Sequence, residues 1–204
     1  MDSTSFWDNA APKYAKSPIS DMAGYEQTLD RIRDLLKPHH RVLELGCGTG
    51  STALELAGGV HSYLGTDLSK QMIEIANEKY GGTGPHQLRF AVAGAGDLPV
   101  GLFDVVLALN VLHLLPNLEA VLEEVFAALP SGGLFVAKTT LLAESPWYVR
   151  WLIPFLRAIG KAPYVRFLAE KELEGMFRNA GFLPAEALTQ DGMAPRFFSV
   201  VTKP

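Results

Sequence analysis

The sequence contains a single cysteine, Cys47, and lacks any long uninterrupted hydrophobic run. One cysteine excludes an intramolecular disulfide framework and does not supply the ligand spacing of a structural zinc site. No apolar stretch approaches the roughly 18 residues that a membrane-spanning helix requires. A basic region followed by an apolar core, the pattern of a secretory signal, is also missing at the N-terminus. We therefore expect a soluble, cytoplasmic protein.

An excess of positive charge is absent as well. The 204 residues carry a formal net charge of −4, from 18 basic and 22 acidic side chains. Proteins that bind nucleic acid need a basic surface to neutralise phosphates, so we expect no nucleic-acid partner. The histidines show no metal-binding spacing and the acidic residues form no cluster, so we expect no metal. With 48% hydrophobic and 20% charged residues, the chain has the composition of one globular domain covering residues 1–204.

What the chain does contain is a glycine-rich segment between a strand and a helix. Residues 42–45, three of which are apolar, have the pattern of a buried strand, and a helical pattern starts at Ser51. Between them, glycines occupy alternate positions at Gly46, Gly48 and Gly50. Glycines allow positive φ and remove Cβ atoms, so a ligand can lie directly on the backbone beside free N–H groups. This arrangement predicts a binding site for a nucleoside-like cofactor.

The rest of the chain alternates between strand and helix patterns. This alternation predicts a parallel sheet with helices on both faces. Residues 1–38 are mostly helical in pattern, and we expect Pro12, Pro18 and Pro38 to interrupt them. Ser69 and Asn117 stand at expected helix N-caps. Predicted strands cover 42–45, 62–67, 88–93, 103–109, 133–140, about 182–188 and 197–202, and predicted helices cover 24–37, 50–58, 69–79, 117–129 and 169–180.

Two carboxylates narrow the choice of cofactor. The spacing of the glycines, with Ser51 at the third small position, departs from the G-x-G-x-x-G/A fingerprint of dinucleotide-binding folds. Glu44 precedes the loop, and Asp67 ends the next predicted strand 21 residues after Gly46. A carboxylate at the end of that strand can accept two hydrogen bonds from a ribose diol.

Several motifs in order resemble class I S-adenosylmethionine-dependent methyltransferases, of the small-molecule, type 11/12-like kind. The resemblance implies an α/β, Rossmann-like, seven-stranded and mostly parallel sheet of order 3-2-1-4-5-7-6, with the last strand antiparallel and helices on both faces. The matching segments are Val42–Gly50, Gly65-Thr66-Asp67-Leu68-Ser69, Leu98-Pro99 before Phe103-Asp104-Val105-Val106, Leu129-Pro130-Ser131-Gly132-Gly133, and Asn179-Ala180-Gly181-Phe182.

The same resemblance implies a cofactor, S-adenosyl-L-methionine, with S-adenosyl-L-homocysteine as product. Glu44 and the backbone of Gly46, Cys47 and Gly48 would hold the methionine end. Asp67 would bind the ribose hydroxyls, and Leu68 would cover the adenine.

Four further positions follow from the resemblance. Gly94 and Ala95 occupy the loop that reaches the adenine, but Gly94 replaces the acid that often accepts the adenine amino group, and Asp97 is the nearest alternative. Asn110 ends the fourth strand, where the chain passes the reactive methyl. Tyr14 belongs to an aromatic N-terminal segment that either forms part of a lid over the cofactor, within residues 1–38, or simply packs.

His113 is the one candidate catalytic base. It lies just past the fourth strand, at the sheet edge where open α/β folds bind ligands. An imidazole could take a proton from a phenol or an amine; the alternative, which the position favours, is that His113 starts the next turn or packs on the sheet. Methyl transfer from a sulfonium requires a base only when the acceptor must lose a proton.

The segment 141–168 interrupts the alternation and holds six of the chain's 20 aromatic residues. As a helix, 147–161 would carry aromatic side chains on one face and basic ones, including Arg150 and Arg157, on another. Three interpretations remain: a cap over a hydrophobic small-molecule substrate, a peripheral contact with a membrane surface, or a helix packed on the sheet.

The resemblance and the insert together predict a methyltransferase that acts on a small, fairly hydrophobic acceptor, by O-, N- or C-methylation. The alternatives are a non-catalytic regulator that binds S-adenosylmethionine and a protein methyltransferase. The sequence does not indicate whether the protein is a monomer or an oligomer.

Overall fold

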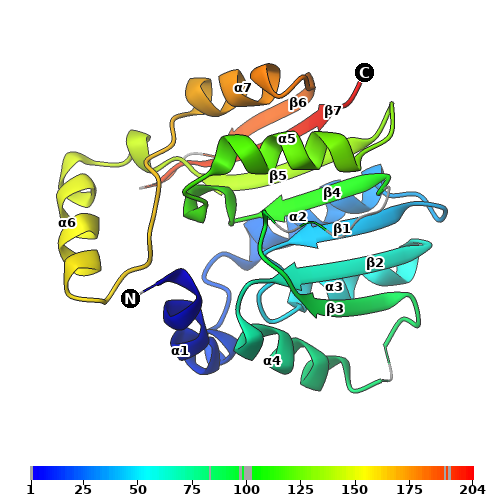
Figure 1. The fold of residues 1–204 in the computed structure, drawn as a ribbon, viewed down its shortest axis with the longest axis horizontal. Helices are drawn as coiled ribbons and strands as arrows, with labels where there is room; N and C mark the ends of the chain where they lie inside the picture. Colours follow the sequence, from blue (N-terminus) through cyan, green and yellow to red (C-terminus); the bar gives the residue numbers. More distant parts are fainter. Residues whose placement is uncertain (1, 83, 97, 99–102, 191, 193) are drawn as a thin grey trace.

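The computed structural model describes residues 2–82, 84–96, 98, 103–190, 192 and 194–204. Its centre is a seven-stranded sheet of order β3-β2-β1-β4-β5-β7-β6 (Figure 1). The strands are β1 (Arg41–Leu45), β2 (Ser62–Asp67), β3 (Leu88–Val92), β4 (Val105–Leu109), β5 (Leu134–Thr140), β6 (Leu183–Gln190) and β7 (Arg196–Thr202). The α-helices are α1 (Ser3–Lys16), α2 (Met22–Leu35), α3 (Ser51–Leu56), α4 (Lys70–Tyr80), α5 (Leu118–Ala128), α6 (Trp147–Ala158) and α7 (Glu170–Asn179). Short 3-10 helices are η1 (Ala57–Gly59), η2 (Leu112–Leu114) and η3 (Leu142–Glu144).

Strand direction follows the predicted topology. Strands β1 to β5 pair in parallel, and β7 runs antiparallel to both β5 and β6. The expected strand order and the antiparallel last strand are therefore confirmed. The carboxyl ends of the parallel strands meet at one edge of the sheet, on the left in Figure 1, where α1 and α6 also lie.

The two faces of the sheet bury separate cores because side chains alternate along each strand. Leu43 and Leu45 of β1 pack with α5 and α7 on one face. Val42 of the same strand packs with α2 and α3 on the other face. The short β1 is buried on both sides, which explains why Val42, Leu43 and Leu45 are all apolar; Glu44 is the one buried charged residue of the strand.

The N-terminal segment divides into two parts with different positions. Helix α2 belongs to the sheet layer, with Leu29 and Ile32 buried in the core. Helix α1 instead packs against α4. The expectation that Pro12 interrupts the helix is wrong, because Pro12 lies inside α1 and the helix ends only before Ser17 and Pro18. The fixed φ of proline suits a helix, so its cost is one lost hydrogen bond and a local clash, which a packed helix can absorb.

Helix ends largely follow their capping residues. The Ser69 side chain accepts a hydrogen bond from Met72 N at 3.1 Å, which confirms the predicted N-cap of α4. Asn117 precedes α5 but makes no capping hydrogen bond through its side chain. Helix α6 continues through Pro154 and ends at Ala158, three residues before the predicted 161, since Gly160 turns the chain with φ of 71°.

Among the described helices, none is long and apolar enough to cross a membrane.

Candidate functional site

The glycine loop between β1 and α3 has the backbone shape that the sequence predicts. Gly46, Gly48 and Gly50 have φ values of 65°, 54° and 75°, in the left-handed region that other residues rarely adopt. A Cβ on Gly46 would lie 2.6 Å from Val111 Cγ2, so this glycine is required by packing. A Cβ on Gly48 would meet only the Tyr14 ring, at 3.8 Å. The backbone at Gly48 is thus open toward α1.

Asp67 at the end of β2 is fixed against this loop. Its carboxylate accepts hydrogen bonds from Gly48 N and from Ser69 N, both at 2.9 Å. Burial raises the pKa of Asp67 in spite of these two bonds. The structure therefore brings together two of the predicted cofactor residues, Gly48 and Asp67, in direct contact.

Glu44 lies in β1 beneath the loop and is 2% exposed. Its Oε2 accepts a hydrogen bond from Tyr63 OH at 2.8 Å. Burial raises the pKa of Glu44 to about 7, and the charge of Asp67 adds to the effect. Neither carboxyl takes part in a salt bridge within the described residues. A buried acid and a half-buried acid without an ion-pair partner favour a positively charged ligand.

Cys47 is buried in the middle of the loop. Its backbone N donates to Thr66 O at 2.9 Å, and a Cβ on Gly65 would lie 3.1 Å from the Cys47 Cβ. Burial and the nearby carboxyls of Glu44 and Asp67 raise the pKa of the thiol. Cys47 is therefore a packing residue whose sulfur stays protonated.

The other positions implied for the cofactor lie at the same edge of the sheet. Leu68 is half-buried beside Asp67, and Ala93 N donates to Asp67 O at 3.0 Å, so Gly94 and Ala95 follow directly. Asp97, the alternative acid for the adenine, lies outside the described residues. Asn110 is exposed after β4 and has φ of 60°, the only positive value of a non-glycine residue in the described part of the chain. Such strain is typical of functional sites.

Helix α1 lies across this edge and contacts the site. Asp8 accepts hydrogen bonds from Ser69 Oγ at 2.6 Å and from Gln71 N at 3.2 Å, at the start of α4. Partial burial and the carboxylates of Asp67 and Glu44 raise the pKa of Tyr14, although 55% of the Tyr14 surface remains exposed. Of the segment 1–38 expected to form a lid, α1 lies at this edge and α2 belongs to the sheet layer; whether α1 covers the cofactor stays a prediction.

His113 lies in η2, just past β4. Its Nδ1 is 3.0 Å from Thr139 Oγ1, and its backbone carbonyl accepts a hydrogen bond from Arg166 N at 2.7 Å. Burial lowers the pKa of His113 to about 4, well below the value near 6.5 that the sequence interpretation assumes. The imidazole is therefore neutral at pH 7 and can accept a proton, but it is a weaker base than a solvated histidine.

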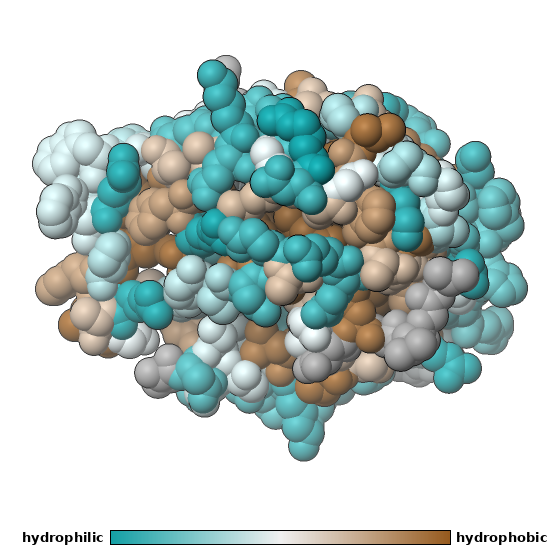
Figure 2. Space-filling model, turned by 45° about the horizontal axis from the view of Figure 1, so that its top comes forward, coloured by the Kyte–Doolittle hydropathy of each residue, from teal (hydrophilic) through white to brown (hydrophobic). Residues whose placement is uncertain are grey.

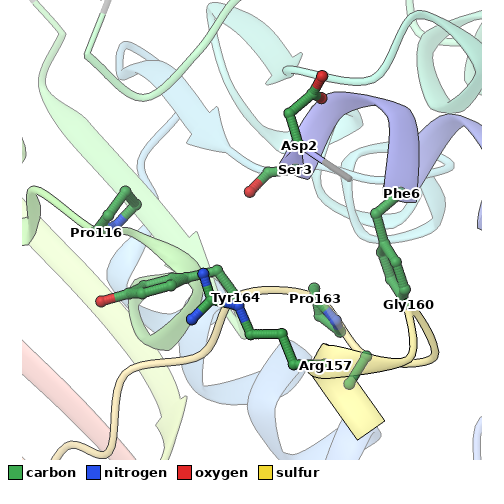
Figure 3. Close-up of a pocket in the computed structure, with 9 residues that line it drawn as sticks. Asp2, Ser3, Phe6, Pro116, Arg157, Gly160, Pro163 and Tyr164 are labelled. Carbon is green, nitrogen blue, oxygen red and sulfur yellow. The ribbon is translucent and has the colours of Figure 1, made fainter. Parts of the chain in front are cut away.

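A cavity of about 530 Å³ opens between the start of α1 and the chain that follows α6 (Figure 3). Phe6 extends from α1 toward the loop at Gly160, and the Arg157 guanidinium stacks 4.9 Å from the centre of the Tyr164 ring. Pro116, which follows η2, lines another wall. Phe6 and Tyr14 are eight residues apart on one helix, so the cavity is roughly 12 Å along α1 from the glycine loop. The complete lining is Asp2, Ser3, Phe6, Pro116, Arg157, Gly160, Ala162, Pro163 and Tyr164.

Sequence reasoning missed three residues that support the site. Asp8 sits within the aromatic N-terminal segment, but its partner Ser69 is 61 residues away. Tyr63 supports Glu44 because β1 and β2 are neighbours in the sheet, and Thr139 of β5 supports His113, which lies in η2 just past the neighbouring β4. A polar residue on a buried strand, such as Thr139, was the available indication. Among the described residues, no three metal-ligating side chains come together.

Comparison with known proteins agrees with this geometry. The family described as "Methyltransferase domain" matches residues 42–133. A demethylmenaquinone methyltransferase of Lactococcus lactis is 30% identical over 202 residues, covering 87% of this chain and 79% of that protein. The 27-O-demethylrifamycin SV methyltransferase of Amycolatopsis mediterranei is 30% identical over 164 residues, covering 78% of this chain and 60% of that protein. The crystal structure of magnesium protoporphyrin IX methyltransferase from Synechocystis, with bound SAH, superposes with a TM-score of 0.73 at 18% identity, covering 99% of this chain and 96% of that one.

The chain therefore belongs to the class I S-adenosylmethionine-dependent methyltransferases. The residues present fit this cofactor: the backbone at Gly48 lacks a side chain, and the carboxyls of the buried Glu44 and the half-buried Asp67 would be acceptors for an ammonium and a ribose diol. When bound, S-adenosylmethionine supplies a methyl group that its sulfonium charge has already activated.

Proposed function

We propose that this methyltransferase acts on a small, fairly hydrophobic organic acceptor held in the cavity between α1 and the segment after α6. The observation that carries this proposal is that two segments far apart in sequence, the start of α1 and residues 157–164, line one cavity. The same helix α1 contacts the glycine loop through Tyr14. Its volume, about 530 Å³, is that of a pocket for a small molecule. Phe6, Pro163 and Tyr164 give it apolar walls, and Asp2 and Arg157 give it polar ones.

The similar proteins support a small molecule as the acceptor. By their names, one relative acts on demethylmenaquinone and another on 27-O-demethylrifamycin SV. Both acceptors are small organic molecules rather than proteins or nucleic acids. We infer the same class of acceptor for this chain.

In this proposal the protein mainly orients the acceptor and excludes water. Helix α1 and the 157–164 segment would enclose the acceptor, which brings its nucleophilic atom to the carboxyl edge of the sheet. For an acceptor with a dissociable proton, His113 would take that proton on its ring while Thr139 holds the ring in place.

The direct test is a transfer assay with radiolabelled S-adenosylmethionine against a panel of phenols, quinols and amines. We expect label in at least one small acceptor. Label found only in proteins would overturn the proposal and favour a protein methyltransferase.

The cavity predicts the effect of Tyr164→Ala. Loss of this ring removes an apolar wall and the stacking partner of Arg157, so we expect the acceptor KM to rise about tenfold. The affinity for S-adenosylmethionine should not change. A matched control is Tyr148→Ala, an exposed aromatic in the same insert that does not line the cavity. Equal KM values for the two variants would contradict the assigned acceptor cavity.

The position of His113 predicts a loss of turnover in His113→Ala. General-base catalysis typically contributes 10²–10⁴-fold, but a base of pKa about 4 is weak at neutral pH, so we expect kcat to fall about tenfold. The pH profile of kcat should show no inflection from this imidazole between about pH 5.5 and 8, since it is already neutral there. Unchanged kcat, together with lower thermal stability, would show that His113 only packs on the sheet.

A further inference from the structure

Helix α6 stands apart from the rest of the fold. None of its residues is buried, and the aromatic side chains Trp147, Trp151 and Phe155 are 75%, 75% and 63% exposed. In Figure 1 it extends beyond the carboxyl ends of the strands. A cavity of about 380 Å³ separates it from the returning chain at Val165 and Phe167. Folding alone therefore does not explain the apolar surface that α6 carries.

The side chains of α6 fall on three sides of the helix. Val149, Ile153 and Leu156 follow helical spacing and are half-buried, so they form the side that faces the protein. A second side is exposed and apolar, and it consists of Trp147, Tyr148, Trp151, Leu152, Phe155 and Ile159. Arg150 and Arg157 lie on the third side, and Lys161 follows just after the helix. The apolar side is thus bordered by positive charge.

This positive charge contrasts with the charge of the whole chain. Residues 145–169 contain Arg150, Arg157, Lys161 and Arg166 and no acidic residue, whereas the complete chain has a net charge of −4. Arg166 is engaged in ion pairs with Glu119 and Glu172. Arg150 and Lys161 are exposed. A surface with exposed aromatic rings, a basic border and no acid is complementary to an anionic surface with an apolar interior.

We propose that α6 is a docking surface for an anionic lipid bilayer. With 12 residues the helix is too short to span the hydrocarbon, so it would lie in the plane of the interface. Trp147, Trp151 and Phe155 would enter the headgroup region, where aromatic rings are favoured. Arg150 and Lys161 would contact the anionic headgroups.

A second copy of the chain fits this surface less well than a bilayer. In a two-fold symmetric dimer the same patch meets itself, so the basic borders of the two copies would face one another. No acidic residue in 145–169 is available to offset that repulsion.

In Figure 2, the end of the molecule where Figure 1 places α6 shows pale and brown residues projecting beside teal ones, as an amphipathic surface requires.

The test is co-flotation of the full chain with vesicles. We expect binding to phosphatidylcholine vesicles that contain about a third phosphatidylglycerol, weak binding to pure phosphatidylcholine, and loss of binding as salt is raised. Arg150→Gln with Lys161→Gln should weaken binding about 30-fold, at roughly fivefold for each charge. Trp147→Ser with Trp151→Ser should weaken it more than about tenfold without changing the charge.

Two matched variants control for general surface effects. Lys171→Gln with Arg178→Gln removes the same charge from the exposed side of α7. Leu183→Ser with Leu188→Ser removes exposed apolar side chains from β6. Both should bind vesicles as the parent does. All variants should keep the parent's melting temperature and affinity for S-adenosylmethionine, because none of these residues touches the cofactor loop.

Two results would overturn the proposal. The first is a parent protein that does not float with the anionic vesicles, or α6 variants that float as well as the parent. The second is a concentration-dependent dimer in analytical ultracentrifugation that the tryptophan substitutions abolish, since this would show that a second copy covers the helix. The vesicle assay contains no methyl acceptor, so its outcome is independent of the proposed acceptor.

Discussion

Asp67→Ala is expected to lower the affinity for S-adenosylmethionine at least about 100-fold. The carboxylate is expected to accept hydrogen bonds from the ribose diol, and in the structure it accepts them from Gly48 N and Ser69 N. Hydrogen bonds to charged groups contribute about 1.5–3 kcal/mol each, so the loss of two to the ligand corresponds to a factor of 10² or more. Released Gly48 would further loosen the loop. Isothermal titration calorimetry at neutral pH measures the effect.

A control distinguishes this loss from a general effect of removing a carboxylate. Glu78 is exposed on α4, and Glu78→Ala should leave the affinity for S-adenosylmethionine unchanged. Circular dichroism should show that both variants are folded. A folded Asp67→Ala protein that binds S-adenosylmethionine as tightly as the parent would refute the assignment of the cofactor site.

Glu44→Gln is expected to change stability and binding in opposite directions. The pKa of Glu44 is about 7 in the folded protein and near 4.5 in the unfolded chain, so the folded state binds more protons between these values. The free energy of unfolding of the parent therefore falls as pH rises from about 4.5 to 7. Glutamine cannot ionise and still accepts the Tyr63 hydrogen bond. Without ligand, the variant should be more stable by roughly 3 kcal/mol at pH 8 and about equal to the parent at pH 4.5.

The same substitution should lower the affinity for S-adenosylmethionine, because the ligand's ammonium needs an ionised acceptor. We expect the parent's affinity for S-adenosylmethionine to rise with pH up to about 7, as Glu44 loses its proton. In Glu44→Gln the affinity should be at least about 30-fold lower at pH 8 and should not follow this titration. Urea unfolding and calorimetry across the pH range measure both effects. Glu74→Gln, an exposed site on α4, should change neither quantity. A variant less stable than the parent at pH 8 would show that Glu44 is stabilising as a carboxylate, contrary to this account.

Most of the fold could be predicted because its determinants are local in the sequence. The apolar run of β1, the alternating glycines after it and the Ser69 cap each define an element without reference to distant residues. The strand order came from the resemblance to a family, since pairing between distant strands has no local signature. The prediction that Pro12 interrupts the helix is wrong because it considers local chemistry alone. Proline disfavours a helix interior, and the packing of α1 on α4 outweighs that local cost.

For the candidate site, the sequence predicts individual residues but not the contacts between distant segments. The positions of Glu44 and Asp67 are defined by their own strands and that of Gly48 by the loop after β1, and the structure brings Gly48 into contact with Asp67. The contact of Asp8 with Ser69 depends on how α1 lies over α4, which no spacing along the chain reveals. Likewise, the pKa of His113 depends on burial by segments more than 20 residues away, such as the strand that holds Thr139.

The position of α1 has a consequence for the order of events in a catalytic cycle. One helix contacts the glycine loop through Tyr14, the start of α4 through Asp8, and the cavity proposed for the acceptor through Phe6. If the acceptor binds in this cavity as proposed, α1 would border both ligands, and both would enter and leave beside the same helix. We expect steady-state kinetics to be ordered, with the methyl donor entering before the acceptor and the spent donor leaving last.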